Sequence, residues 1–441
     1  MPTTDAAEVV PLLQQLIRNA CVNMGPGSEA GETRNAETIL SLLSSTGSEV
    51  EVLEPGKAGR GSIVARIEGT DPSAPSLCLM GHLDVVPANA DTWRHDPFGG
   101  ELIDGEVWGR GAVDMLNQTS AMAVAFSRLA QSGFRPKGDL VYFGVADEEA
   151  GGRDGAGVMV DQHRDLVVTD YCLTEVGGAI DKAGRVFVGT AEKGGAPVTL
   201  RVKGRASHGS VPYGSDNALV TAAEVVRRIA ATRGPSDVID TWRQWVAAQS
   251  YEPELTATLL DPDRLWDALP TLGGLAGNAH ACTHLTAAPT MVLPADSQKI
   301  NIIPDEVRLV VDMRLLPTQG EDDVRAFLDD ALGDLADRVD VKIHYAHSGT
   351  ASATETPLWE SMTRAVQQAY PSATLMPSMM AGTTDARWLR PAGVTTYGFG
   401  LLSDKVSPSD FWSRFHGKDE RIDVESLLLS VELWEWLARD F

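Results

Sequence analysis

The sequence predicts an α/β protein in which a larger domain, with a mainly parallel mixed sheet flanked by helices, is interrupted by a smaller α+β domain. The chain has 441 residues, which exceeds the size at which a single hydrophobic core usually stops growing. From about residue 60 to 190, short apolar runs alternate with helical patterns, as in open parallel sheets. From about 193 the strands alternate apolar and polar residues, and the first pattern returns after about 350. The predicted parts are residues 1–192, 193–349 and 350–441.

The first α/β segment contains short runs that are apolar almost throughout, which is typical of strands covered on both faces. The predicted strands are 62–69, 76–84, 140–149 and 171–178. Residues 117–133 repeat apolar side chains at helical spacing and end at Gly133, which indicates a helix. Three of the strands end in histidine or acidic residues at their carboxyl side, where open α/β sheets gather ligand sites.

The middle of the chain predicts a second strand-and-helix pattern. Its expected strands are 196–207, 305–316 and 341–345, and its expected helices are 217–232 and 321–337. Residues 234–290 contain proline and tryptophan but show no clear period, so we interpret them as an insertion of unknown purpose. After residue 350, helices are expected at 357–370 and 424–441, which returns the chain to the larger domain.

Composition excludes several classes of protein. The formal charge is −24, with 61 acidic against 37 basic residues, so no basic stripe is available for a nucleic-acid partner. No run approaches 18 uninterrupted apolar residues, and the amino terminus carries acidic residues where a secretory signal needs basic ones. The four cysteines are far apart and form no CxxC pair. We therefore expect a cytoplasmic protein without a membrane span.

The run "GHLDVVP" places His82 and Asp84 two residues apart at the end of a predicted strand, so both side chains point to one face. A metal-bound imidazole with a carboxylate that orients it needs this arrangement. A satisfied polar pair at a strand end is an equal alternative for this motif alone.

Two further motifs carry carboxylates. In "GRGAVDM", Asp114 lies in a glycine-rich loop before a helix, where both carboxylate oxygens can bridge two cations or where the side chain can simply bond helix amides. In "ADEEAGG", Glu148 and Glu149 are adjacent after an apolar strand. Adjacent residues of an extended chain point to opposite sides, so one can bind a metal while the other reaches a water. A solvated loop is the alternative for this pair.

Glu175 in "LTEVGG" and His416 in "FHGKDE" complete the candidate set. A single histidine is usually not a ligand, but here two histidines and three acidic residues fall at strand ends or in glycine-rich loops. Mixed imidazole and carboxylate ligands suit zinc, with cobalt or manganese as substitutes.

Together these motifs resemble the di-zinc family of acetylornithine deacetylase, succinyl-diaminopimelate desuccinylase, glutamate carboxypeptidase and aminoacylase. The resemblance runs from "GHLDVVP" through "WGRGAVDM", "ADEEAGG", "EVGG" and "ASHGSVPYGSDNAL" to "NIIPDEVRLVVDMR", "AGTTDAR" and "FHGKDE". It implies two Zn²⁺ per subunit, one held by His82, Asp114 and Glu175 and the other by Asp114, Glu149 and His416. Asp114 is then the bridge, and Asp84 supports His82.

The resemblance also implies a mechanism and a substrate site. Glu148 matches the general base, which takes a proton from a water shared by the two ions and passes it to the leaving nitrogen. His208 in "ASHGS" matches a histidine that reaches the active site of the partner subunit and stabilises the oxyanion. The matching substrate contacts are Asn301, Arg314, Gly382 and, as a second carboxylate anchor, Arg387. A homodimer through the inserted domain is expected.

The sequence leaves the substrate open. A carboxypeptidase or dipeptidase and an N-acyl-amino-acid deacylase, including a deacetylase or desuccinylase of amino-acid biosynthesis, share the chemistry and need the same carboxylate anchor. Glu175, where some members have Asp, favours the carboxypeptidase and deacylase branch. The insertion at 234–290 is longer than in compact members, which leaves the lid and the dimer contacts open.

Other classes of function fit the sequence less well. The run "GGRDGAG" lacks the order of a phosphate loop, and no G-x-S-x-G elbow is present. A non-catalytic, metal-stabilised binding protein is the alternative from another class, but such a protein has no need of Glu148. The predicted substrate is a small peptide or N-acyl amino acid.

Overall fold

The computed structural model describes residues 6–25, 31–293 and 299–441, and these residues form two compact units. Unit 1 comprises residues 1–190, 352–378 and 384–441, and unit 2 comprises residues 191–351 and 379–383. The predicted α/β class with an interrupting smaller domain is confirmed. Residues 379–383 were expected in the larger domain, whereas the structure groups them with unit 2.

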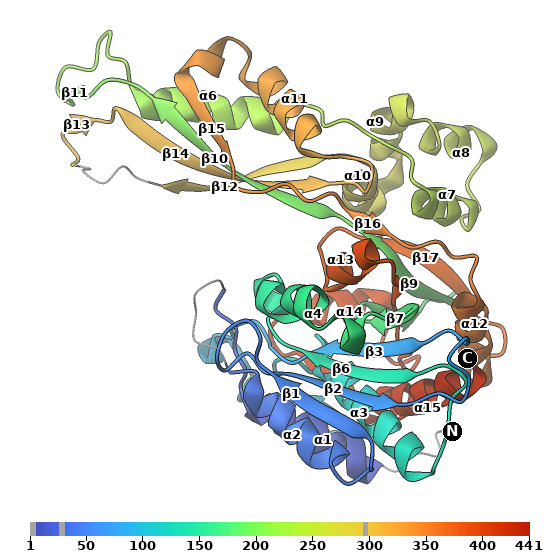
Figure 1. The fold of residues 1–441 in the computed structure, drawn as a ribbon. Helices are drawn as coiled ribbons and strands as arrows, with labels where there is room; N and C mark the ends of the chain where they lie inside the picture. The colour runs from blue at the N-terminus through green and yellow to red at the C-terminus, as the bar shows by residue number, and fades with distance from the viewer. Residues whose placement is uncertain (1–5, 26–30, 294–298) are drawn as a thin grey trace. The chain divides into compact units, whose positions relative to one another are not determined.

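Unit 1 is built on a mixed sheet with the strand order β1-β2-β6-β3-β7-β18-β9 (Figure 1). The four central strands β6, β3, β7 and β18 are parallel to one another, and the strands toward the edges are antiparallel. The bounds are β1 (Glu49–Leu53), β2 (Ser62–Ile67), β6 (Leu140–Val145), β3 (Leu77–His82), β7 (Tyr171–Thr174), β18 (Thr395–Gly398) and β9 (Arg185–Glu192). Strands β8 (Gly177–Ile180) and β17 (Thr374–Met380) also pair with β9, and β16 (Thr350–Ala351) pairs with Ala191 and Glu192, the end of β9 that belongs to unit 2.

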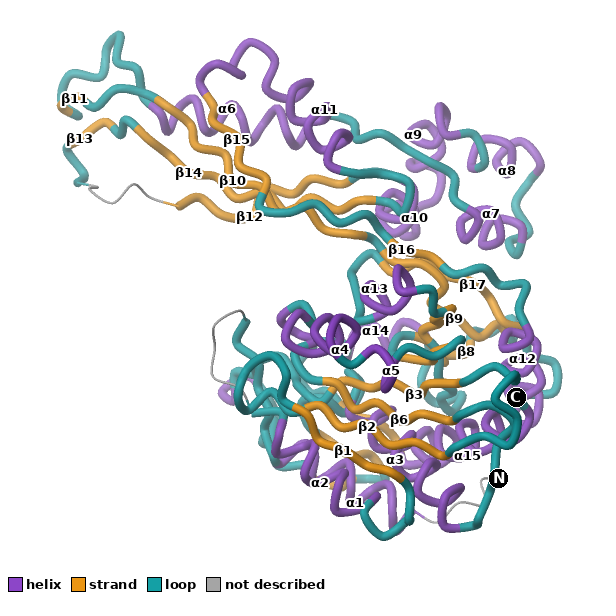
Figure 2. Tube along the Cα trace, viewed as in Figure 1, coloured by secondary structure: helices purple, strands orange, loops and turns teal. Residues whose placement is uncertain are grey.

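Helices cover both faces of this sheet, because its strands are apolar on both faces. On β2, Ile63 and Ala65 belong to one core cluster, and Val64 between them belongs to another. The first cluster includes α1 (Ala6–Arg18), α2 (Thr33–Leu43), α3 (Leu116–Gln131), α12 (Pro357–Ala369) and α15 (Val424–Asp440). The second includes α4 (Val158–Gln162), α5 (Arg164–Val167) and α13 (Ala386–Leu389). The result is the three-layer arrangement visible in Figure 2.

A small antiparallel sheet in unit 1 ties two distant segments together. Its order is β19-β5-β4, with β19 (Arg421–Asp423), β5 (Glu106–Trp108) and β4 (Glu101–Ile103). Strand β19 follows the segment after α14 (Pro408–Arg414), and β5 precedes the loop that leads to α3. The pairing of Arg421 with Trp108 therefore brings the residues before β19 close to the residues after β5.

Unit 2 contains a four-stranded antiparallel sheet covered on one face by two helices (Figure 1). The order is β12-β14-β10-β15, with β12 (Thr286–Leu293), β14 (Glu306–Leu315), β10 (Gly194–Lys203) and β15 (Val339–Ile343). Alternate residues such as Val198 and Val311 are buried under α6 (Ala218–Ala231) and α11 (Glu321–Leu332). A two-stranded ribbon, β11 (Ser207–His208) with β13 (Ile302–Ile303), extends the unit.

Much of the segment 234–290 is helical, although its sequence shows no clear period, and its last residues begin β12. Its helices are short: α7 (Asp240–Ala247), α8 (Pro253–Leu259), α9 (Leu265–Ala268) and α10 (Ala276–Thr283). Trp242, Leu259, Leu265 and Cys282 form a separate core cluster among them. One or two turns are too few for a helical period to stand out from the sequence, which explains why the prediction missed them.

The longer predicted elements are present, with ends that shift by a few residues. The predicted helices at 117–133, 217–232, 357–370 and 424–441 correspond to α3, α6, α12 and α15. The predicted strands that were extended through acidic residues, 140–149 and 171–178, end earlier, at Val145 and Thr174. No helix within the described residues is long and apolar enough to cross a membrane.

A candidate dinuclear metal centre

Five side chains converge at the carboxyl ends of adjacent parallel strands in unit 1. His82 ends β3, Glu175 follows β7, and Glu149 lies four residues after β6. Because β6, β3 and β7 are neighbours and parallel, their carboxyl ends meet at one edge of the sheet. Asp114 comes from the loop between β5 and α3, and His416 from the segment after α14.

The five side chains form two groups that share one carboxylate. The groups are His82, Asp114 and Glu175, and Asp114, Glu149 and His416; in each, the candidate ligand atoms lie within 4.8 Å of one another. Nε2 of His82 is 3.0 Å from Oδ1 of Asp114 and 3.9 Å from Oε2 of Glu175. Nε2 of His416 is 2.7 Å from Oδ2 of Asp114 and 3.3 Å from Oε2 of Glu149. The structure thus brings together the five residues that the motifs singled out as ligands.

Burial of these charged groups destabilises the folded protein when no metal ion is bound. The side chains of His82, Asp114, Glu149 and Glu175 are at most 5% exposed, and His416 is half exposed. Burial and then the charge of Asp114 raise the pKa of Glu175 well above its ordinary value, and the same two causes raise the pKa of Glu149. Burial opposes the charged form of His82, but Asp114 and Glu175 outweigh it and raise its pKa.

The donor set fits divalent cations. In the protein alone, protons must offset the negative charge of three buried carboxyl groups, since unpaired buried charges are costly. Hydrogen bonds to Asp114 and Glu149 raise the pKa of His416 to about 10, so its imidazole holds one of these protons. Oε1 of Glu149 is buried and has no hydrogen-bond partner among the described residues. Divalent cations held by these oxygen and nitrogen atoms would supply the positive charge that the cluster lacks.

Asp84 supports the cluster differently from the predicted way. The ring Nδ1 of His82 lies 2.9 Å from the backbone carbonyl oxygen of Asp84, and the carboxylate Oδ1 is farther away, at 3.6 Å. The other oxygen, Oδ2, accepts hydrogen bonds from Nδ2 of Asn23 and from the backbone N–H of Glu149. Asp84 therefore orients one imidazole through its main chain and fixes the Glu149 backbone through its side chain.

Glu148 and Glu149 lie in a 3-10 turn, η2 (Glu148–Ala150), instead of the predicted extended chain. The turn follows Asp147, whose φ of 70° is unusual for a residue with a side chain. Glu148 does not belong to either ligand group, and burial followed by the charge of Glu175 raises its pKa well above the ordinary value. A carboxyl group with a raised pKa beside a candidate cation site is suited to exchanging protons.

A buried network that the sequence did not reveal holds this turn. Arg60 is 2% exposed and forms ion pairs with Glu32 and Asp147 at 2.5 and 3.0 Å. Oδ2 of Asp147 also accepts a hydrogen bond from the backbone N–H of Asp154. These contacts fix the residue whose strained backbone aims the two glutamates. Sequence alone gives no signal for this network because its members are far apart in the chain.

The "AGTTDAR" segment contributes Asp385 and Arg387 to unit 1. Burial raises the pKa of Asp385 to about 7, although the positive charge of Arg387 acts in the opposite direction. Both carboxylate oxygens of Asp385 lack hydrogen-bond partners among the described residues. A side chain at Gly152, whose φ is 65°, would overlap with Oδ1 of Asp385. The guanidinium of Arg387 stacks 5.5 Å from the ring of Trp388. Its predicted role as a carboxylate anchor stays a prediction.

The other predicted substrate residues belong to unit 2. His208 and Asn301 lie on neighbouring segments, since the backbone N–H of Gly209 donates to the carbonyl of Asn301 at 2.7 Å. Both are exposed. Arg314 forms an ion pair with Asp312 of the same strand, with Nε of Arg314 2.9 Å from Oδ1 of Asp312. Gly382 lies in the segment 379–383 that is grouped with unit 2. The roles of these four residues stay predictions.

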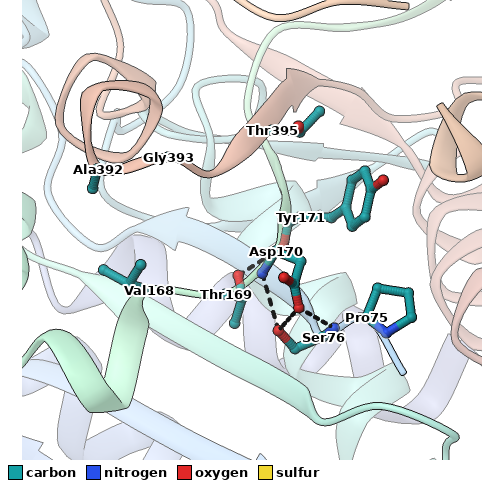
Figure 3. A pocket seen from close by; sticks show the side chains of 9 residues that line it. All are labelled: Pro75, Ser76, Val168, Thr169, Asp170, Tyr171, Ala392, Gly393 and Thr395. Carbon is teal, nitrogen blue, oxygen red and sulfur yellow. Dashed lines mark hydrogen bonds between the residues drawn. The ribbon is translucent and has the colours of Figure 1, made fainter. Parts of the chain in front are cut away.

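A separate cavity of about 510 Å³ lies at the opposite end of the unit 1 sheet. Figure 3 shows it between Tyr171, which begins β7, and Thr395, which begins β18. The carboxylate of Asp170 in this cavity accepts hydrogen bonds from the backbone N–H and the hydroxyl of Ser76. Its charge is therefore already bonded within the protein, and the cavity offers no cluster of reactive groups.

Two candidate cation-binding groups that share a carboxylate, with Glu148 beside them at the edge of a parallel sheet, are the arrangement of a dinuclear metallohydrolase. The model of Peptidase family M20/M25/M40 matches residues 78–440. The chain therefore belongs to this peptidase family. The match confirms the predicted family and the predicted class of enzyme, a metallohydrolase acting on peptide or amide bonds.

Curated relatives have several activities in their names. The chain is 25% identical over 403 residues to probable carboxypeptidase S-like 2 of Dictyostelium discoideum, an alignment that covers 86% of this chain and 74% of the relative. It is 26% identical to N-fatty-acyl-amino acid synthase/hydrolase PM20D1 of Xenopus tropicalis, covering 85% and 74%. It is 25% identical to succinyl-diaminopimelate desuccinylase of Xanthomonas euvesicatoria, covering 82% and 83%.

Solved structures share the fold. The M20 family metallo-carboxypeptidase Sso-CP2 from Sulfolobus solfataricus aligns with a TM-score of 0.75 at 16% identity, covering 99% of both chains. Human carnosine dipeptidase 1 aligns with a TM-score of 0.68 at 15% identity, covering 99% of this chain and 96% of the other.

Proposed function

We propose that the protein is a zinc-dependent hydrolase that cleaves an amide or peptide bond whose amine side is an amino acid with a free carboxylate. The observation that carries this proposal is the position of Asp114, which presents one carboxylate oxygen to each of two ligand groups. Zinc is the proposed metal because both groups combine imidazole with carboxylate, and cobalt or manganese are expected substitutes.

Different residues of the chain have different roles in the proposed hydrolysis. When bound, two zinc ions lower the pKa of a water and polarise the amide carbonyl. Glu148 takes the proton of the attacking water on its carboxylate and returns it to the leaving nitrogen. Both steps require the pKa of Glu148 to lie near the working pH in the metal-loaded enzyme. Asp84 and the Arg60 network hold the turn that carries Glu148 in place. His208 of the partner subunit is proposed to stabilise the oxyanion, and Asn301, Arg314, Gly382 and Arg387 to bind substrate.

The relatives support an amide bond that involves an amino acid, since their names include a carboxypeptidase, an N-fatty-acyl-amino acid synthase/hydrolase and a desuccinylase. A carboxypeptidase or dipeptidase and an N-acyl-amino-acid deacylase are therefore both retained. Desuccinylation is a second candidate, because one desuccinylase, of Rhodopseudomonas palustris, reaches 31% identity over 226 residues.

We propose a homodimer through unit 2. Strand β12 lies at the end of the sheet order, and its residues Met291 and Val292 are exposed. Leu219 and Val220 at the start of α6 are exposed as well. Exposed apolar side chains on one unit are typical of an interface between chains. Light scattering on the purified protein tests this, and a monomer at micromolar concentration contradicts it.

A reducing compartment, the cytoplasm, is proposed because Cys21, Cys78, Cys172 and Cys282 are all buried free thiols. This proposal concerns location only and does not bear on the chemistry.

The test is hydrolysis of a panel of N-acyl amino acids, dipeptides and N-succinyl diamino acids by zinc-loaded protein, with metal content measured in parallel. The matched variant is Glu148→Ala, which should retain about two ions per chain and lose hydrolysis. The panel ranks the substrate classes. A wild-type protein that holds two ions and cleaves none of the panel contradicts the proposed substrate, and one that binds no ions contradicts the metal centre.

A further inference from the structure

A buried ion pair outside the ligand set forms hydrogen bonds with the main chain of two of the candidate ligands. Arg110 is 4% exposed and Glu420 is fully buried, and Nη1 of Arg110 lies 2.6 Å from Oε2 of Glu420. Neither residue belongs to the candidate ligand groups. A buried ion pair needs further hydrogen bonds to offset the loss of hydration, so the partners of its remaining atoms show what it holds.

The remaining atoms of Glu420 hold the bridging ligand. Oε1 of Glu420 accepts hydrogen bonds from the backbone N–H of Val113 at 2.6 Å and of Asp114 at 3.0 Å. These bonds fix the main chain of Asp114 in a loop that has no regular strand or helix between β5 and α3. The position of the shared carboxylate therefore depends on Glu420.

One further nitrogen of Arg110, Nη2, holds the main chain of the exposed candidate ligand His416. Nη2 of Arg110 donates to the backbone carbonyl of His416 at 3.3 Å, and its guanidinium stacks 5.3 Å from the ring of Trp93. His416 has a φ of 54°, a conformation that side-chain-bearing residues seldom adopt, and its side chain is 48% exposed. A half-exposed ligand on a strained loop depends on contacts to its main chain for its position.

We infer that Arg110 and Glu420 act as a clamp that positions Asp114 and His416, which together with Glu149 would hold one of the two ions. The clamp joins two loops that are far apart in the sequence, and the pairing of β5 with β19 places its two members side by side. Supporting residues of this kind orient the ligands before the metal arrives. The inference rests on the proposed metal centre and adds two positioning residues to it.

The test uses metal-free protein titrated with Zn²⁺ against a chelating indicator, which resolves two binding steps. The variants are Glu420→Gln, which keeps the shape of the side chain without its charge, and Arg110→Lys, which keeps the charge without the planar fork. We expect Glu420→Gln to weaken both steps, because Glu420 holds the shared residue Asp114, and Arg110→Lys to weaken mainly the step that involves His416, each by about tenfold to 100-fold. Thermal unfolding of the metal-free proteins establishes that the variants are folded.

The matched control is Asp423→Asn. Asp423 is another buried carboxylate, close in sequence to Glu420, but it accepts its hydrogen bonds from Ser403 and Ser426 instead of from a ligand segment. This variant should lower stability without changing either binding step. Equal weakening in the control, or unchanged steps in folded Glu420→Gln and Arg110→Lys proteins, would overturn the clamp.

Hydrogen exchange of the wild-type protein gives a second readout that needs no variant. A clamp that acts before metal binding should protect the amides of Val113 and Asp114 in the metal-free protein already. Rapid exchange there that becomes slow only with Zn²⁺ overturns the inference. If wild type binds no Zn²⁺, the metal centre itself is wrong; if it binds two ions and the variants match it, only the clamp is wrong.

Discussion

Nε2 of His416 lies 2.7 Å from Oδ2 of Asp114, while the other oxygen of that carboxylate faces His82 at 3.0 Å. One carboxylate thus contacts two imidazoles with two different atoms. This division suits a carboxylate that would bridge two cations, and Asp114 belongs to both candidate ligand groups.

Replacing Asp114 with asparagine should impair both ion-binding groups together. The carboxamide has one oxygen in place of two, so it cannot serve both ions. We expect affinity to fall by more than the roughly 10–100-fold that supporting residues contribute, measured by metal content after dialysis. The control is Asp170→Asn in the cavity of Figure 3, which should keep its metals. Retention of both tight ions by Asp114→Asn would show that Asp114 does not bridge.

Glu148 and Glu149 are neighbours with different expected roles, which gives an internal comparison. Glu148→Gln should keep both ions and lower kcat by about 10²–10⁴-fold, because the loss is that of a general base. Glu149→Gln should release an ion, because Oε2 of Glu149 belongs to a ligand group. Metal analysis and kinetics on the two proteins check this. A Glu148→Gln protein with full turnover contradicts the assigned base.

Metal binding should release protons, and its affinity should rise with pH. Hydrogen bonds to Asp114 and Glu149 raise the pKa of His416 to about 10 in the metal-free protein, so its imidazole is protonated at neutral pH. A cation must displace this proton to reach Nε2, and the competition weakens as pH approaches 10. Calorimetry in buffers of different ionisation enthalpy counts the released protons. Asp423→Asn should release as many protons as wild type and His416→Ala fewer, and binding without proton release contradicts the protonated state.

The proposed contribution of His208 across a dimer interface can be tested by mixing two inactive proteins. His208→Ala and Glu148→Ala subunits each lack one function, but a mixed dimer contains one site with both. We expect activity to reappear after the two are unfolded together and refolded, or co-expressed. Each variant refolded alone is the control. Mixed dimers that stay inactive while their metals are bound place His208 and Glu148 in the same chain's site or exclude His208.

The clustering of the candidate ligands could be predicted from the sequence better than the residues that support them. His82, Asp114 and Glu175 stand at strand ends or in glycine-rich loops, where short motifs can be read directly. Arg60 contacts Asp147 from a distant part of the chain, and such long-range pairing leaves no local pattern. Glu420 lies four residues after His416, inside the motif "FHGKDE". Its supporting role could not be predicted from the motif, because the role depends on the hydrogen bond from the backbone N–H of Asp114.

Elements with a clear sequence period could be predicted, whereas turns set by tertiary contacts could not. The long amphipathic helix α15 and the alternating strand β14 have periods that a sequence window can detect. The glutamates at 148 and 149 were expected in extended chain, and the structure has a 3-10 turn after Asp147 instead. A left-handed residue such as Asp147 is imposed by tertiary contacts, here to Arg60, which local propensity does not report.

A buried lysine in unit 2 should make stability depend on pH. Burial lowers the pKa of Lys193 from 10.5 to about 7, and its Nζ donates to the carbonyl of His284 at 2.6 Å. Between pH 7 and 10.5 the unfolded chain therefore binds a proton that the folded chain does not. The free energy of unfolding contributed by this lysine must then rise with pH across that window, by at most about 1.4 kcal/mol per pH unit.

The measurement is denaturant unfolding of wild type and Lys193→Met at pH 7, 8 and 9. The difference between the two proteins should grow in favour of wild type as pH rises, because the variant lacks the titrating group. Lys203→Met is the control, since Lys203 lies on β10 with its side chain 46% exposed, and it should show no such growth. A constant difference between wild type and Lys193→Met would mean that Lys193 keeps its proton in the folded protein, with the charge stabilised by the carbonyl of His284 and the hydroxyl of Thr286.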